Sequence, residues 1–155
     1  MCNIHRRRLV RCMAAGLTLT PLAAALSACG KPSWPEGMAE IRWDRDTCAR
    51  CNMVISDRRF AAEVRGGPRD QVFKFDDIGC VVFWLQQQPW APDARIWVAD
   101  AASRLDNLAW LDARKAHYMS GKSSPMGYNQ SAYSLPQAGA ATYAEMAEHI
   151  LAKGK

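Results

Sequence analysis

The chain has 155 residues, with 20 Lys and Arg against 15 Asp and Glu, and a formal net charge of +5. Four of the arginines and none of the acids lie in residues 1–28, so the remaining 155 − 28 = 127 residues carry 16 − 15 = +1. That near-neutral remainder gives no electrostatic case for nucleic-acid binding. It is long enough for one domain with its own hydrophobic core.

Residues 1–28 have the organisation of a bacterial export signal. Arginines between residues 6 and 11 precede an apolar stretch at 17–26, which is too short, and too interrupted by Pro21, to span a membrane. The stretch ends in Leu26-Ser27-Ala28-Cys29, which resembles a lipobox and predicts cleavage before Cys29 and a lipid on its thiol. Position 30 is Gly and not the Asp that retains some lipoproteins at the inner membrane, which favours location at the outer membrane.

The first predicted structural elements follow a flexible segment. Residues 29–40 are rich in Pro and Gly and predict a tether, and residues 41–153 predict one compact domain. Strands are predicted at 59–64, 71–75 and 94–99, from alternating and β-branched residues. Asp76 and Asp77 predict an N-cap with an acidic first turn, and the helix they open runs through 79–86 and stops before Pro89.

The second half has weaker patterns. A short strand or turn is predicted at 110–112, a strand at 116–120 and an extended piece at 128–135. Thr142 and Glu145 have the spacing of a capping box and predict a helix from there to about residue 153. Each half therefore pairs short strands with one helix, which indicates an α+β protein.

The segment Cys48-Ala-Arg-Cys51-Asn-Met53 is predicted to be a loop or turn and is the strongest chemical signal in the chain. Two thiols outside the cytoplasm can hold a metal, act as a redox pair or close a local disulfide. Val54 and Ile55 make a poor helix start, unlike the helix that follows the cysteines of thioredoxin-like proteins. Met53 adds a thioether, and thiolates with a thioether favour soft ions such as Cu(I).

Two other functions stay open beside copper binding. A periplasmic thiol–disulfide protein would use Cys48 and Cys51 as its redox pair. A structural lipoprotein would use the same two residues as a local disulfide and bind no metal.

Three more residues are candidates for the metal site. Met126 lies in the turn at 124–127 and not on an apolar stripe, which makes it a candidate ligand. His117 and Met119 lie two residues apart on one face of the predicted strand. Imidazole is a good copper ligand, although His117 also fits an ordinary hydrogen-bonded strand residue.

The remaining reactive side chains are expected to be structural. Cys80 lies in an apolar helix and is expected to be a buried structural thiol, and Met146 is expected in the core. His149 is expected to face solvent. No nucleophile–base pair, phosphate loop or cluster of carboxylates stands out in the sequence, so we do not expect an enzyme.

Four motifs in this order resemble the NosL family. They are the lipobox, Cys-x-x-Cys-x-Met-x-Ile at 48–55, Phe-Asp-Asp-Ile-Gly-Cys at 75–80 and Ser-Pro-Met-Gly at 124–127, and the resemblance extends from about Cys29 to about Lys153. NosL proteins are copper-binding accessory lipoproteins of nitrous-oxide reductase assembly. The resemblance implies an α+β fold of two related ββαβ units, with which the predicted first half agrees and the second half agrees loosely.

The same resemblance implies a function and a ligand set. It implies a periplasm-facing lipoprotein, attached to the membrane through Cys29, that passes copper to nitrous-oxide reductase or to its membrane-associated maturation complex. One Cu(I) ion would be bound. The implied ligands are Cys51 and Met53 first, Met126 as the third, Cys48 after these, and His117 and Met119 as completing ligands.

Overall fold

A computed structural model describes residues 34–154 of the chain. The predicted export signal (1–28), the predicted lipidation at Cys29 and the first residues of the predicted tether lie outside these residues. Neither helix in the part that the structure describes is long and apolar enough to cross a bilayer.

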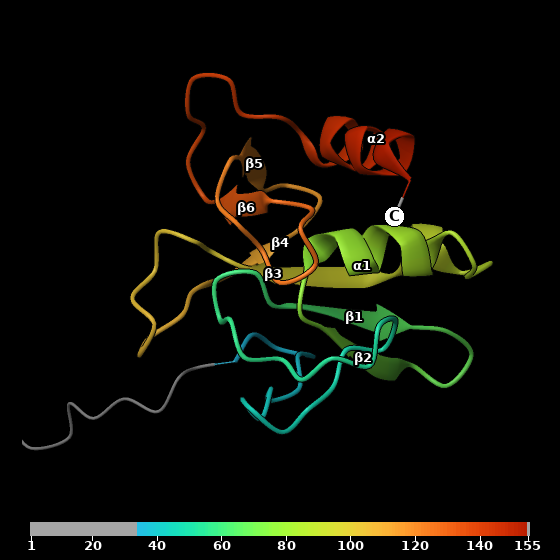
Figure 1. Ribbon diagram of the computed structural model, residues 1–155. Helices are drawn as coiled ribbons and strands as arrows, with labels where there is room; N and C mark the ends of the chain where they lie inside the picture. The colour runs from blue at the N-terminus through green and yellow to red at the C-terminus, as the bar shows by residue number, and fades with distance from the viewer. Residues whose placement is uncertain (1–33, 155) are drawn as a thin grey trace, which may run out of the picture. The chain divides into compact units, whose positions relative to one another are not determined.

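Two sheets and two α-helices make up the described domain (Figure 1). The larger sheet has the strand order β2-β1-β3-β4, with each neighbouring pair antiparallel, and β5 and β6 form a separate antiparallel pair. The elements are β1 (Ala62–Gly66), β2 (Gln71–Phe75), α1 (Ile78–Leu85), the 3-10 helix η1 (Ala91–Asp93), β3 (Arg95–Ala99), β4 (Trp110–Asp112), β5 (His117–Ser120), β6 (Gln130–Tyr133) and α2 (Tyr143–Lys153).

The predicted α+β class is confirmed. The first half is a ββαβ unit formed by β1, β2, α1 and β3, as the resemblance implied. In the second half β4 joins the sheet of the first half, and β5, β6 and α2 form a ββα arrangement. No strand follows α2 up to residue 154, so among the described elements the second unit lacks the closing strand of the first.

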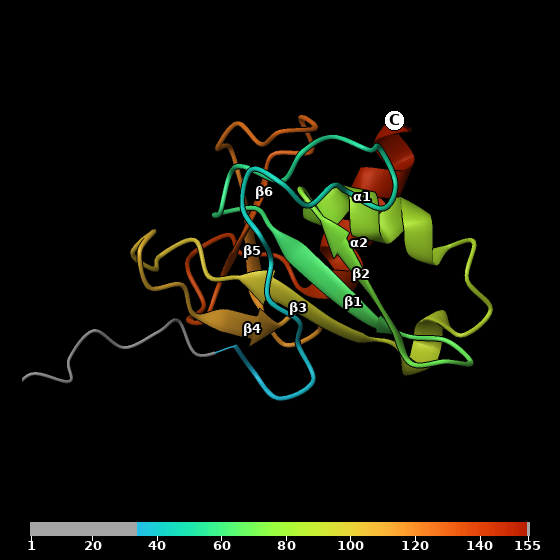
Figure 2. The ribbon, with the colours of Figure 1, turned by 90° about the horizontal axis from the view of Figure 1, so that it is seen from below.

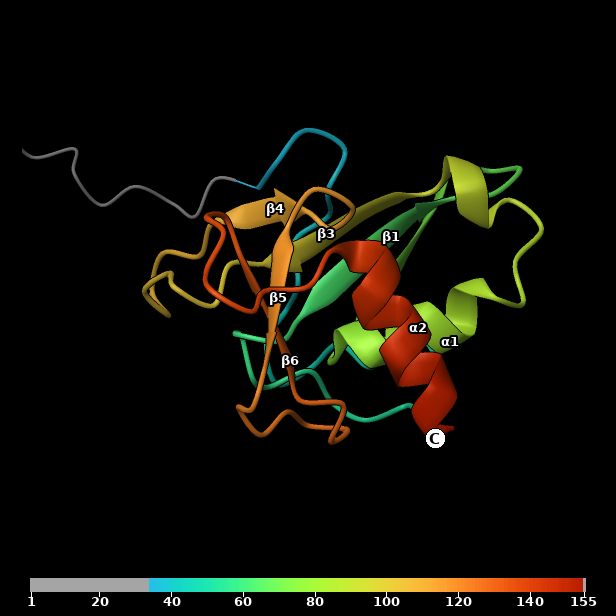
Figure 3. The same cartoon turned by 90° about the horizontal axis from the view of Figure 1, so that it is seen from above.

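Alternation along the strands separates two hydrophobic clusters, one on each face of the larger sheet. Figure 1 shows α1 and α2 on one face and the start of the described chain, in blue, on the other, and Figures 2 and 3 show the same arrangement from below and from above. We call these the helix face and the tryptophan face. The residues of the larger sheet that pack on the helix face are Ala62, Val64, Phe73, Phe75, Ile96, Val98 and Leu111, and those on the tryptophan face are Trp97 and Trp110.

Part of the predicted tether is packed on the domain. The Trp34 ring lies 5.3 Å from the Trp110 ring, and Met38 is buried in the cluster of the tryptophan face. These apolar side chains cover sheet surface that would otherwise be exposed to water. Packed structure therefore begins before residue 41, the predicted start of the domain.

The first strand begins later than predicted. We expected it at 59–64, but residues 58–60 form a turn and β1 starts at Ala62. The Asp57 carboxylate accepts hydrogen bonds from the Arg59 side chain at 2.9 and 2.6 Å and from the Arg59 backbone N–H at 3.1 Å. This local pairing favours a turn over an extended strand.

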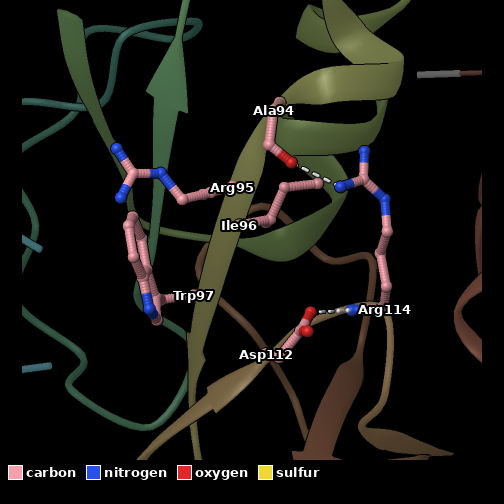
Figure 4. A pocket seen from close by; sticks show the side chains of 6 residues that line it. All are labelled: Ala94, Arg95, Ile96, Trp97, Asp112 and Arg114. Atoms are coloured by element: carbon pink, nitrogen blue, oxygen red, sulfur yellow. Dashed lines mark hydrogen bonds between the residues drawn. The ribbon is translucent and has the colours of Figure 1, made fainter. Parts of the chain in front are cut away.

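Local capping and one arginine secure the helical elements. The predicted capping box is confirmed, because Thr142 accepts from the Glu145 N–H while Glu145 accepts from the Thr142 N–H. Figure 4 shows Arg114, in the turn after β4, reaching across to the Ala94 carbonyl beside β3. Arg114 also donates to the Ala91 carbonyl at 2.8 Å, so it ties η1 to the sheet edge.

Glu63 is a fully buried carboxyl on the tryptophan face. Glu63 lies in the middle of β1, and its Oε1 accepts from the Ala39 N–H at 2.7 Å, which holds the N-terminal segment against the sheet. Its Oε2 is buried and has no hydrogen-bond partner. Burial raises the pKa of Glu63 from its ordinary 4.5 to about 7.

We predict that Glu63→Gln removes a pH-dependent loss of stability. The unfolded chain ionises Glu63 near pH 4.5 and the folded chain near 7, so stability falls as pH rises through that window. By pH 8 the wild type should lose about 3 kcal/mol relative to the variant, as measured by urea unfolding at both ends of the window. Glu148→Gln on the exposed side of α2 is the control, and parallel pH profiles for wild type and Glu63→Gln would contradict the prediction.

Candidate metal centre

The two cysteines of the Cys-x-x-Cys motif lie in a closed turn, as predicted. An isolated antiparallel bridge between Thr47 and Val54 closes the turn, and the Cys48 N–H donates to the Met53 carbonyl at 2.8 Å. Asn52 adopts a left-handed conformation (φ 61°), which asparagine tolerates better than most residues. The turn is therefore fixed by its own backbone before any ligand is bound.

A second segment, from Asp76 to Cys80, brings further ligands to the same place. The Ala49 N–H donates to the Lys74 carbonyl at 2.8 Å, which fastens the cysteine turn to β2 two residues before Asp76. Helix α1 begins at Ile78, so Cys80 lies in its first turn. Only Asp77 caps this helix, by accepting from the Gly79 N–H at 2.9 Å, and the predicted acidic first turn is absent from α1.

The two segments meet in a cluster of three thiols and one carboxylate. One ligand atom from each of Cys48, Cys51, Asp76 and Cys80 lies within 4.8 Å of the other three. A tetrahedral ion with metal–sulfur bonds of about 2.3 Å needs sulfurs about 3.8 Å apart, so a small contraction would let these atoms close on a metal. Cys48, Asp76 and Cys80 are buried and Cys51 is half-buried, which leaves the Cys51 side as the accessible one.

Hydrogen bonds make Cys48 the anionic thiol of the cluster. The Cys80 thiol bonds to Cys48 and, with backbone N–H groups of Cys51, Asp76 and Arg50, lowers the pKa of Cys48 to about 4 despite its burial. The same contact, together with burial, raises the pKa of Cys80. Burial and the neighbouring Cys48 thiolate raise the pKa of Cys51 to about 11. The free protein therefore concentrates one negative charge on Cys48.

Asp76 presents an unused ligand atom. Its Oδ1 accepts a hydrogen bond from the Cys51 thiol at 3.5 Å, while its buried Oδ2 has no hydrogen-bond partner. Burial and the Cys48 thiolate raise the pKa of Asp76 to about 6. A buried oxygen without a partner costs free energy in the free protein, and a cation in the cluster would remove that cost. The donor set thus fits a metal ion.

Arg50 supplies positive charge beside the cluster. Its Nη1 lies 4.0 Å from the Cys80 sulfur and 2.9 Å from the Tyr128 hydroxyl, and its guanidinium stacks 4.7 Å above the Phe83 ring centroid. The Tyr128 ring packs on Gly79, where a Cβ would lie 2.1 Å from the Tyr128 Cγ. Only glycine fits there, so the close approach of this ring to α1 positions the Arg50 partner.

The predicted methionine ligands lie at the border of the cluster. The Met53 side chain is 48% exposed, while its backbone carbonyl accepts from Cys48 and its N–H bonds to the Cys51 sulfur. Met126 is half-buried, and its N–H donates to the Asp77 Oδ2 at 3.3 Å, which places its turn at the N-terminal end of α1. Met126 also packs against the hydrophobic cluster that contains Cys48 and Cys80.

The structure places His117 and Met119 on β5, in the smaller sheet. Both lie on β5, half-buried, opposite Tyr133 and Ser131 of β6. Among residues 34–154, His117 is not one of those whose ligand atoms converge with Cys48. The predictions for the last helix are confirmed: His149 is exposed and Met146 is buried.

Sequence reasoning missed three residues of the site. Cys80 is buried, as expected, but it faces the other thiols and is not an isolated structural thiol. Asp76 was assigned to the helix cap, a role that only Asp77 fills. Arg50 lies inside the Cys-x-x-Cys motif, and its contact with Cys80 was not predicted. One signal in the sequence could have indicated these residues. Cys80 is the third, unpaired cysteine, and the predicted helix that contains it begins directly after two acids.

We predict that Cys48 is the ionised thiol in the reduced, metal-free protein at neutral pH. Cys48→Ser should remove about one equivalent of thiolate absorbance in the ultraviolet, because Cys48 carries the lowered pKa. Cys51→Ser is the matched control and should leave that absorbance in place, because the pKa of Cys51 is raised. Equal losses in the two variants would contradict this assignment of charge.

The sequence and the fold of this chain were compared with those of known proteins. The NosL family model matches residues 41–149, which is more than half of the chain. The crystal structure of the copper chaperone NosL from Shewanella denitrificans matches with a TM-score of 0.54 and 17% sequence identity, over 77% of this chain and 89% of that chain. At that identity the likeness bears on the fold alone. Among curated proteins, none matches this sequence. On the family match, the chain belongs to the NosL family.

Proposed function

We propose that this protein binds one Cu(I) ion at the thiol cluster and carries it to a recipient. The observation that supports this most is the convergence of Cys48, Cys51 and Cys80 from two separate segments within 4.8 Å of one another. Thiolates are soft ligands that select Cu(I) over harder ions. The related protein from Shewanella denitrificans is itself described as a copper chaperone.

The burial of the ligands suits a carrier. Cys48 and Cys80 are buried and would retain the ion, whereas Cys51 is half-buried and Met53 is exposed beside it. A ligand of the recipient can therefore approach from the Cys51 side and replace Cys51 before the inner thiols release the metal. The exchange would break the Cu–S bond to Cys51 as a bond between copper and the recipient's ligand forms, with copper remaining Cu(I) throughout. Asp76, 3.5 Å from the Cys51 sulfur, is placed to exchange a proton with that thiol.

The recipient we propose is the copper centre of nitrous-oxide reductase, reached directly or through its membrane-associated maturation complex. Membership of the NosL family supports this recipient, and the lipobox supports attachment to the membrane through Cys29. The protein would face the periplasm, with the outer membrane favoured by Gly30. Binding and transfer need no bond-making chemistry on a substrate, so we propose a carrier and not an enzyme.

A thiol–disulfide function is the second candidate, favoured by one observation. The pKa of Cys48 is lowered to about 4, and a cysteine with a lowered pKa is typical of a redox-active pair. Cys51, a second free thiol in the same motif, would be its partner. The methionine separates the two functions. Met53→Leu should leave a redox activity of Cys48 and Cys51 intact, and it should weaken a copper site.

We predict one tight Cu(I) equivalent in an anaerobic titration of the reduced protein against a chromophoric chelator. Cys48→Ser, Cys51→Ser and Cys80→Ser should each weaken the affinity by about 100-fold or more, and Met53→Leu by about tenfold. Met38→Leu is the matched control, because Met38 is buried in the other cluster. Failure of the wild type to compete with the chelator would exclude the copper site, and unchanged affinity in Cys80→Ser would exclude Cys80 as a ligand.

We predict that recipient maturation depends on both the site and the anchor. A denitrifying bacterium that lacks its own NosL should regain copper-loaded nitrous-oxide reductase when it expresses this chain, but not Cys51→Ser. The Cys29→Ser variant should no longer be found in the membrane fraction. It should restore less copper-loaded reductase, because lipidation concentrates the carrier where the recipient is assembled. Reductase copper content is the measurement. No restoration by the unmodified chain would exclude this recipient, and full restoration by Cys51→Ser would exclude a need for Cys51.

A further inference from the structure

The tryptophan face carries an aromatic and aliphatic patch that the metal centre does not use. The Trp34 and Trp110 rings lie 5.3 Å apart, and Trp43 packs in the same cluster. Leu105, which is 53% exposed, projects from the loop between β3 and β4 beside them. These side chains surround one shallow pocket, and we call them the tryptophan patch: Trp34, Trp43, Leu105, Leu108 and Trp110.

Two arginines border the tryptophan patch. The Arg58 guanidinium lies 5.2 Å over the Trp43 ring, and its Nη1 donates to the Leu105 carbonyl at 2.8 Å. Arg104, the neighbour of Leu105, has 83% of its side chain exposed and pairs with Asp106 at 2.9 Å. Of these three charged side chains, Arg58 and Asp106 line the pocket itself and Arg104 lies beside it in the chain. Indole rings with arginines at their edge match the headgroup region of a bilayer.

The chain itself brings this patch close to a membrane. Trp34 is the first residue of the patch, and it follows the predicted lipidated Cys29 by five residues. Five residues span at most about 18 Å even when fully extended. A lipid on Cys29 would therefore keep Trp34 within a short distance of the bilayer surface, at an effective concentration that favours even a weak contact.

We propose that the tryptophan patch lies in the headgroup region of the membrane that holds the lipid on Cys29. This inference rests on the anchoring in the proposed function and goes beyond it, because a tether alone would leave the domain free to tumble. Contact through the tryptophan face would orient the domain. The cysteines pack in the cluster of the opposite, helix face, so the orientation would direct the metal centre away from the bilayer and towards a recipient.

The test uses the full mature lipoprotein in vesicles of phosphatidylethanolamine and phosphatidylglycerol whose acyl chains carry bromine near the headgroup. Brominated lipids quench tryptophan only at short range. We expect quenching of the wild type and a fall of roughly half in Leu105→Asp, because a carboxylate disfavours the interface. Leu135→Asp is the matched control, since Leu135 is 73% exposed but does not line the pocket of the patch. Copper binding should be unchanged in both variants.

Flotation of the vesicles separates this inference from the proposed anchoring. Protein that does not float with the vesicles overturns both the anchor and the membrane contact. Protein that floats but shows no quenching, or equal quenching in wild type and Leu105→Asp, overturns the membrane contact alone and leaves the copper carrier in place. Quenching that Leu135→Asp reduces as much as Leu105→Asp also overturns the assignment to this face.

Discussion

The Asp77 carboxylate is buried and accepts hydrogen bonds both from its own helix and from a distant turn of the chain. Its Oδ1 accepts from the Gly79 N–H and caps α1, while its Oδ2 accepts from the Ser124 hydroxyl at 2.5 Å and from the Met126 N–H. The first contact fixes where α1 begins and therefore where Asp76 and Cys80 lie. The others hold the 124–127 turn of the second half against that helix end. The metal centre depends on this one side chain, although Asp77 is not one of its ligands.

Features set by neighbouring residues were predictable from the sequence, and those set by distant ones were not. The bounds of β2 follow from alternation, and the start of α2 follows from Thr142 and Glu145, three residues apart. The cysteine turn was predicted for the same reason. Cys80 joins that turn because the Ala49 N–H meets the Lys74 carbonyl, a contact between segments 25 residues apart that no local pattern records. The two roles of Asp76 and Asp77, adjacent and chemically alike, are likewise separated only by packing.

The charge balance of the centre explains how it can be both stable and exchangeable. A buried Cys48 thiolate is tolerable because Cys80 and three backbone N–H groups donate to it, with Arg50 nearby. Two further thiols must lose protons before a cation is fully bound, and Cys51 does so at the accessible side with Asp76 beside it. Protons would therefore compete with a bound metal most directly at Cys51, the accessible residue of the cluster.

The ligands come from a turn at 48–51 and from a strand–helix junction at 76–80, and they meet only when the sheet has formed. A bound ion would consequently add its binding free energy to the stability of the fold, less whatever the turn alone can bind in the unfolded chain. An empty chain would unfold more often than a loaded one and would be more exposed to proteases. The abundance of the protein in its compartment would then follow the supply of metal, without any change in its synthesis.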